Sequence, residues 1–258
     1  MAFIRCDFSS AALMRAVNVN IIIPQNISVS ERKILYLLGG LSDDNTMWCR
    51  RTSIERYADA CGMMVVMPNG ERSFYTDAVQ GEKFWTFVSE ELPEVIHTLF
   101  NFKPSKENTF AAGLSMGGYG AIKLGLRLPE RFSAVAGLSS VTDLKWRYQA
   151  ADSTSWKPEL DRIFGGIEQL EAEKNDLFSL AEEAVASKKT LPRILSICGT
   201  EDFMINDNRR FNDFMQQIKY PGFDYFEYPG AHTWEFWDTH IQLILNFFTT
   251  GKLPEKKK

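Results

Sequence analysis

Residues 113–117 carry the pattern that points most directly to chemistry, a serine between two glycines in the run Gly-Leu-Ser-Met-Gly. A serine hydroxyl is a weak nucleophile at neutral pH, so it needs access to substrate, a base that takes its proton and donors for the oxyanion. The glycines permit a strained strand-to-helix turn that lifts the serine oxygen above the edge of a sheet. An apolar run precedes the motif and a helix rich in small residues follows it. The sequence therefore predicts Ser115 as a nucleophile; the alternative is a glycine-serine turn without a chemical role.

The base must come from the three histidines of the chain. For a nucleophilic serine on this kind of turn, the acid and then the histidine follow later in the chain. His97 precedes Ser115, and His240 lies inside the last predicted helix. His232 instead follows an expected strand and a Pro-Gly-Ala turn, and sites of open α/β sheets gather at such strand ends. We predict His232 as the base, with capping of the final helix as its alternative role.

The orienting acid should lie between the serine and the histidine, after another strand. Asp202 meets this condition, because it follows an apolar run at residues 191–198 and a Gly-Thr turn. Its carboxylate would hold the imidazole tautomer and stabilise the imidazolium without becoming protonated. Aspartate also commonly caps helices, and Glu201 or Asp207 could take its place. We predict Asp202 as the acid.

An oxyanion hole needs two backbone N–H groups, one of which comes from the residue after the nucleophile, Met116. The other should lie in the loop after an early strand, here the Gly-Gly-Leu run at residues 39–41. Leu41 is the predicted donor, and Gly40 is the alternative. Small residues in this loop would let the backbone approach the substrate.

These residues must be positioned by strands that alternate with helices along the chain. Such alternation predicts an α/β fold, with a mainly parallel, doubly wound sheet and helices on both faces. Residues 2–8 and 13–24 are expected to form an opening hairpin whose second strand is half exposed. The other expected strands are 33–38, 63–67, 109–112, 133–138, 191–198 and 223–228, and the expected helices are 54–61, 84–100, 119–127, 203–218 and 233–248.

One interval breaks this alternation. Residues 141–190 lack a convincing strand but hold two tryptophans and a helical segment at 167–187, so they are predicted to form a small cap inserted above the sheet. The whole chain, residues 1–258 with this cap included, is expected to form one domain, because sheets of this kind commonly form one domain at this length. The lysine-rich residues 252–258 are expected to be a solvated tail.

Composition and charge exclude several classes of protein. The net charge of −4 argues against a general nucleic-acid binder, which needs a basic face. Apolar runs are too short to span a bilayer, and the N-terminus lacks a signal-peptide pattern, so we expect a cytoplasmic protein. The four cysteines fall outside Cys-x-x-Cys spacing, and no metal or cofactor is expected. The expected partner is a small-molecule ester, and a homo-oligomer stays open.

With these residues located, the chain resembles the esterase D and S-formylglutathione hydrolase family, and within it the bacterial tributyrin esterases. The resemblance covers nearly the whole chain and implies the α/β-hydrolase fold, with hydrolysis of short-chain acyl esters through Ser115, Asp202 and His232 and with Leu41 and Met116 as oxyanion donors. One departure is Gly-Gly at residues 39–40, where many relatives have His-Gly. The motifs that carry the resemblance are residues 36–42 with Trp48, 67–70 with 73–77, 113–120, 198–202 and 230–234.

The predicted function is a serine carboxylesterase for acetyl to butyryl esters, such as tributyrin, aryl esters or acetylated sugars. An S-formylglutathione thioesterase is the main alternative, followed by an acyltransferase and by a catalytically silent binding module of the same fold. Five aromatic residues could line an acyl pocket or simply pack in the core, namely Trp48, Phe74, Tyr75, Trp146 and Trp156.

Overall fold

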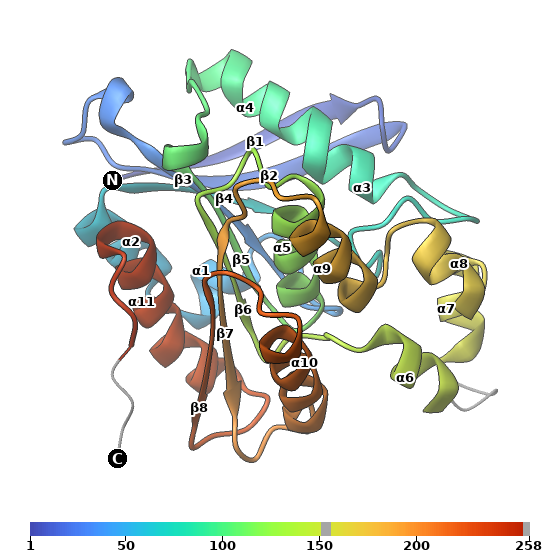
Figure 1. Ribbon diagram of the computed structural model, residues 1–258. Coiled ribbons are helices and arrows are strands. Elements are labelled where there is room, and N and C mark those ends of the chain that lie inside the picture. Colours follow the sequence, from blue (N-terminus) through green and yellow to red (C-terminus); the bar gives the residue numbers. More distant parts are fainter. Residues whose placement is uncertain (151–155, 255–258) are drawn as a thin grey trace.

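The computed structural model describes residues 1–150 and 156–254. It contains an eight-stranded sheet in the order β1-β2-β4-β3-β5-β6-β7-β8 (Figure 1). All pairs from β4 to β8 are parallel, whereas β1 and β2 pair antiparallel at one edge. The predicted mainly parallel sheet is therefore confirmed. The strands are β1 (Ala2–Ser10), β2 (Arg15–Ile23), β3 (Lys33–Leu38), β4 (Met63–Pro68), β5 (Thr109–Leu114), β6 (Ala134–Leu138), β7 (Arg193–Gly199) and β8 (Phe223–Tyr228).

Helices cover both faces of this sheet, which explains why the strands are apolar at consecutive positions. In β3, Leu35 and Leu37 join the core on one face, while Ile34 and Leu38 join the core on the other. The first face carries α1 (Met47–Arg51), α2 (Ile54–Cys61) and α11 (Trp234–Thr250). The second carries α3 (Phe84–Thr86), α4 (Leu92–Phe100), α5 (Met116–Arg127), α9 (Leu177–Ala186) and α10 (Ile205–Gln217).

The expected single helix at residues 84–100 is interrupted by a π-helical segment, Phe87–Glu91. Pro93 follows it and has no backbone N–H with which to continue the helical ladder. The carbonyl of Ser89, four residues earlier, instead accepts a hydrogen bond from the guanidinium of Arg131 at 2.5 Å. The sequence did not indicate this break, because the helical spacing of apolar residues continues through residues 84–100.

The expectation of a half-exposed second strand is wrong for most of its length. In β2, residues 19–23 are all buried. The reason is tertiary: β2 lies between β1 and β4, and α2 contacts it. Polar Asn20 is accommodated there because its side-chain amide donates to the carbonyl of Asn45 at 2.9 Å.

The interval 141–190 forms four helices in its described part: α6 (Leu144–Ala150), α7 (Lys157–Phe164), α8 (Ile167–Ala172) and α9. The single helical segment expected at 167–187 is thus two helices. α9 packs on α5 and α10 in the helical layer, whereas α6, α7 and α8 contact one another beside the sheet (Figure 1). Residues 151–155 of this interval, and 255–258 of the expected tail, lie outside the described residues. Over residues 1–150 and 156–254, none of the helices is long and apolar enough to cross a membrane.

Candidate active site

Ser115 lies at the turn between β5 and α5. Its backbone has φ 54° and ψ −117°, a conformation that costs a non-glycine residue about 1–3 kcal/mol and persists only where the surroundings enforce it. A Cβ on Gly117 would lie 2.4 Å from the carbonyl oxygen of Leu38, and one on Gly113 would lie 2.4 Å from the backbone of Gly117. Close backbone packing therefore requires both glycines of the motif.

Asp202 and His232 are brought together by two loops that follow β7 and β8. The loops contact each other directly: Glu201 N–H donates to the carbonyl of Gly230 at 3.0 Å. His232 Nδ1 lies 2.9 Å from Asp202 Oδ2 and 3.0 Å from Oδ1. Because a carboxylate only accepts, Nδ1 carries the proton and Nε2 is left as the basic nitrogen.

The side chain of Asp202 is fully buried. Burial raises its pKa, but hydrogen bonds with His232, Ser139 and the N–H of Met204 outweigh burial, so the pKa of Asp202 lies below its ordinary value. Ser139 is itself held by the indole N–H of Trp237 at 3.1 Å. The carboxylate therefore stays ionised beside His232 at neutral pH.

The alternative acids and histidines have other partners. Glu201 accepts a hydrogen bond from the N–H of Gly230, and Asp207 pairs with Arg147 of α6 and with Arg210 of its own helix, α10. His97 is exposed on α4. His240 is buried in α11, where its Nδ1 lies 2.7 Å from the carbonyl of Phe236. Among the candidate acids and histidines, Asp202 and His232 are the two that lie within hydrogen-bond distance of each other.

The loop at residues 39–41 offers two candidate oxyanion donors, the N–H groups of Gly40 and Leu41, and the structure distinguishes between them. The N–H of Gly40 donates to Asp43 Oδ2 at 2.8 Å. That hydrogen bond occupies Gly40, so Leu41 is the better candidate donor in this loop. Both Leu41 and Met116 line the cavity that Ser115 enters. Asp43 was not among the residues predicted from the sequence, although aspartate is a common turn residue.

Two further side chains hold this loop by its carbonyl oxygens. The indole N–H of Trp48 donates to Leu38 at 3.1 Å, and the hydroxyl of Tyr75 donates to Gly39 at 3.0 Å. The loop is thus fixed by buried aromatic donors. Trp48 and Tyr75 are core residues with this structural role and do not line the cavity.

A cavity of about 890 Å³ unites the candidate residues. Ser115, His232, Leu41 and Met116 all contribute to its wall. Its remaining lining is mostly apolar and aromatic, with a few charged groups, which is the composition expected of a small-molecule site. These further residues include Phe74, Leu114, Val141, Leu144, Trp146, Trp156, Leu160, Phe203, Trp234 and Trp237, together with Asp43, Arg51, Arg147 and Glu235.

Two aromatic residues that contact His232 were not predicted as site residues from the sequence. The ring of Phe203 lies 4.5 Å from that of His232, and Trp237 meets the same imidazole edge-on at 4.8 Å. Phe203 is 66% exposed, which is unusual for so large an apolar side chain. Its position directly after Asp202 is the only signal that could have indicated it.

A family model described as "Putative esterase" matches residues 10–248 of the chain. An acetyl esterase of Caldicellulosiruptor saccharolyticus is 29% identical over 93% of this chain and 96% of its own length. Among solved structures, fluorophosphonate-binding serine hydrolase F of Staphylococcus aureus superposes with a TM-score of 0.87 at 30% identity, covering 96% of this chain and 98% of that one.

An S-formylglutathione hydrolase of Staphylococcus aureus gives a TM-score of 0.85 at 30% identity, covering 96% of this chain and 99% of that one. These matches confirm the α/β-hydrolase fold expected from the sequence. The chain belongs to this esterase family and is a serine hydrolase that acts on carboxylic esters.

Proposed function

We propose that the protein hydrolyses short-chain acyl esters, acetyl to butyryl, through a triad of Ser115, His232 and Asp202. The observation that carries this proposal is the hydrogen bond from His232 to the buried carboxylate of Asp202, at the wall of the cavity that Ser115 lines from its strained turn. The carboxylate leaves His232 Nε2 free to accept a proton. No other pair of the weighed acids and histidines is joined in this way.

In the first half of the reaction, Ser115 Oγ attacks the ester carbonyl carbon while His232 Nε2 takes the hydroxyl proton. The backbone N–H groups of Leu41 and Met116 stabilise the resulting oxyanion. Collapse of the tetrahedral intermediate breaks the bond to the alcohol, which leaves with the proton from His232. Water then attacks the acyl-serine by the same route, which releases the acid and restores Ser115.

The acyl group is proposed to be small, carried by a glyceride, an aryl alcohol or an acetylated sugar. The relative named acetyl esterase supports a short acyl group, and the narrower likeness to tributyrin esterases rests on the sequence motifs. A cavity of about 890 Å³ leaves room for an alcohol much larger than the acyl group.

A p-nitrophenyl ester series from acetate to octanoate tests this proposal. We expect a burst of p-nitrophenol followed by steady turnover, highest for acetyl to butyryl esters. Ser115→Ala should abolish both, with a loss on the order of 10⁶-fold in kcat. Ser30→Ala, at an exposed serine of the short 3-10 helix Val29–Glu31, is the control and should match the parent. Equal rates for the parent and Ser115→Ala would reject the mechanism.

A thioesterase for S-formylglutathione is the second candidate, favoured by the hydrolase of that name at 30% identity. It would be recognised by a kcat/KM for that thioester far above the value for any oxygen ester. Acyl transfer to an alcohol would appear as ester products when glycerol or a sugar is added to the same assay. A silent binding module would give no fluorophosphonate labelling of the folded protein.

A further inference from the structure

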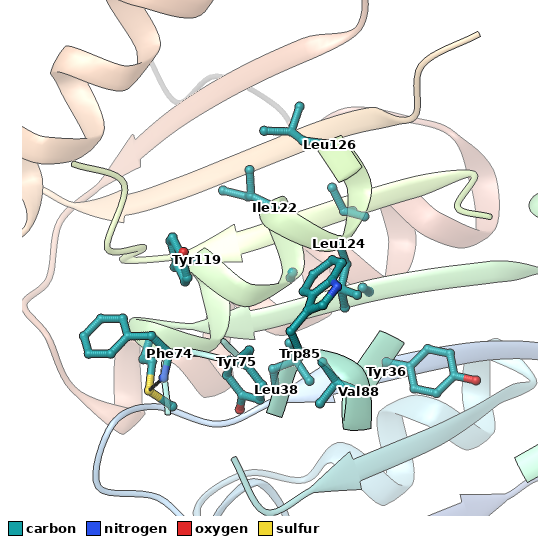
Figure 2. Close-up of a cluster of buried hydrophobic side chains, with 14 of the residues drawn as sticks. Tyr36, Leu38, Phe74, Tyr75, Trp85, Val88, Tyr119, Ile122, Leu124 and Leu126 are labelled. Carbon is teal, nitrogen blue, oxygen red and sulfur yellow. Dashed lines mark hydrogen bonds between the residues drawn. The ribbon is translucent and has the colours of Figure 1, made fainter. Parts of the chain in front are cut away.

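The segment of residues 73–76 has a strained backbone that the proposed triad does not explain. Phe74 and Tyr75 are consecutive non-glycine residues in the left-handed region, with φ 49° and 47°. Such residues cost of order 1–3 kcal/mol each and persist where the surrounding structure over-determines them. Both side chains are buried on the α5 side of the sheet (Figure 2).

Two glycines make room for the ring of Tyr75. A Cβ on Gly70 would lie 2.4 Å from the Tyr75 hydroxyl oxygen, and a Cβ on Gly120 would lie 2.6 Å from its ring. Gly120 belongs to α5, the helix that begins after Ser115. The segment is therefore fitted tightly against the helix that carries the nucleophile at its start.

Lys123 of α5 holds this segment by hydrogen bonds from its side chain. It is fully buried, and its side-chain nitrogen Nζ donates to Thr76 Oγ1 at 2.7 Å, to the side-chain oxygen of Asn175 at 3.2 Å and to the carbonyl of Phe74 at 3.3 Å. The face of the Tyr119 ring lies 4.8 Å from the same nitrogen. Burial, together with the nearby charge of Arg127, lowers the pKa of Lys123 well below its ordinary value, and its hydrogen bonds to these three oxygens do not depend on a charged partner. Within the described residues, Lys123 forms no salt bridge with a carboxylate.

From this anchored segment, two contacts reach the two sides of the candidate oxyanion hole. The N–H of Phe74 points to the sulfur of Met116 at 3.3 Å. The hydroxyl of Tyr75 donates to the carbonyl of Gly39, two residues before Leu41. One short segment thus contacts both the loop after β3 and the first residue of α5, although these lie far apart in the sequence.

We propose that residues 73–76 brace the oxyanion hole, setting the distance between the N–H groups of Leu41 and Met116, and that Lys123 is the positioning residue of this brace. The inference rests on the proposed function, because it assigns a role in the transition state of ester hydrolysis. Oxyanion stabilisation is made only in the transition state. A displaced donor therefore lowers kcat while KM changes little.

Tyr75→Phe is the sharpest test, because it deletes one buried hydroxyl and keeps the ring. We expect kcat for p-nitrophenyl acetate to fall about tenfold, less than the about 100-fold loss that follows removal of a donor itself, with KM within about twofold. The rate is expressed per site labelled by a fluorophosphonate, so that unfolded protein does not count. Tyr220→Phe is the matched control: its buried hydroxyl also donates to a carbonyl, that of Pro192 at 3.1 Å, away from the cavity.

The contact with Lys123 is tested through its shortest hydrogen bond. Thr76→Val removes the hydroxyl that accepts from Lys123 and keeps the branched shape, whereas Thr76→Ser keeps the hydroxyl. We expect a loss of about tenfold in kcat for valine, and near-parent kcat for serine.

Three outcomes decide the proposal. Tyr75→Phe equal to Tyr220→Phe in kcat per labelled site would overturn the brace while leaving the esterase function intact. Equal kcat for the valine and serine variants at residue 76 would overturn the role of Lys123. A parent protein without any ester turnover would instead overturn the proposed function, and the brace with it.

Discussion

The two walls of the cavity differ in how they are built. The inner wall is formed by strand ends and the turns that follow them: the loop 39–43, Phe74, Ser115 and Met116. Its members at Phe74, Ser115 and Met116 are each less than 9% exposed. The outer wall comes from α6, α7 and the residue before α7, and its tryptophans, Trp146 and Trp156, are 46% and 44% exposed.

This difference in construction suits the inner wall to the chemical step and the outer wall to contact with the substrate. The inner wall is fixed by buried hydrogen bonds and by glycines that no larger residue could replace, so its atoms are held as catalysis requires. The outer wall presents half-exposed rings, each beside an arginine: Arg210 lies 4.8 Å from the ring of Trp146, and Arg72 lies 5.7 Å from that of Trp156. Substitutions in the inner wall and its supports should therefore change kcat, and those in the outer wall should change KM.

Among the residues that support or line the walls without being the nucleophile, the largest effect is expected from Asp202→Asn. The amide keeps the shape but favours the wrong tautomer of His232, so kcat should fall about 10⁴-fold. Steady-state kinetics with p-nitrophenyl acetate measure the loss. Glu201→Gln, at the neighbouring carboxylate, should stay within about tenfold of the parent. A larger loss for Glu201→Gln than for Asp202→Asn would reverse the assignment of the acid.

A smaller effect is expected at Asp43, which fixes the oxyanion loop. Asp43→Ala removes the acceptor for the N–H of Gly40, and we expect kcat to fall about 100-fold, as for outright loss of an oxyanion donor. Asp43→Asn keeps an oxygen at the same place and should retain most of the activity. The ratio of kcat between these two variants is the measurement. Equal losses in both would mean that the charge of Asp43, not its hydrogen bond, is what the loop needs.

Asp43 also predicts a dependence of stability on pH. Burial raises the pKa of Asp43 despite its hydrogen bond from Gly40. A carboxyl whose pKa is raised in the folded state destabilises that state once ionised. The cost is absent below the ordinary pKa of about 3.9 and grows as the pH rises through the higher folded value. Asp43→Asn should therefore raise Tm at pH 7 and leave it unchanged at pH 3, as thermal unfolding at both values would reveal.

The smallest effect is expected at the outer wall. Trp146→Ala and Trp156→Ala should leave kcat for p-nitrophenyl acetate within about twofold, and raise KM by about threefold to tenfold for esters of bulky alcohols, since each ring contributes about 1 kcal/mol of contact. A series of esters with one acyl group and alcohols of increasing size separates the two constants. A tenfold fall in kcat for the acetate would place the outer wall in the chemistry and end the distinction between the walls.

Much of the inner wall could be predicted from the sequence. The motif around Ser115 was recognisable because an apolar strand precedes it and a run of small residues follows it in the sequence. The order of serine, acid and histidine together with positions after strands favoured His232 and Asp202, with Glu201 and Asp207 as alternative acids. The structure places His232 and Asp202 within hydrogen-bond distance. Strand bounds were predicted to within a few residues, because buried parallel strands are short apolar runs between turn residues.

The outer wall and the supports could not be predicted in the same way. The sequence did not decide whether Trp146 and Trp156 line the pocket or pack in the core, because a tryptophan looks the same in the sequence in either place. The break in the helix at residues 84–100 accompanies Pro93, but the residue that satisfies the freed carbonyl of Ser89, Arg131, lies outside that helix. Lys123 looks like any helical lysine, and only the fold surrounds it with Thr76, Phe74 and Asn175.

The sequence by itself determined the nucleophile motif, the order of its partners and the alternation of strands and helices, because each depends on neighbours along the chain. Only the tertiary structure decided which donor of the loop 39–41 is available, through Asp43, and what holds residues 73–76 in a strained conformation. Both depend on contacts between segments whose closeness no local pattern records. The candidate catalytic groups can thus be found in the sequence, while the precision with which they are held is a property of the packed fold.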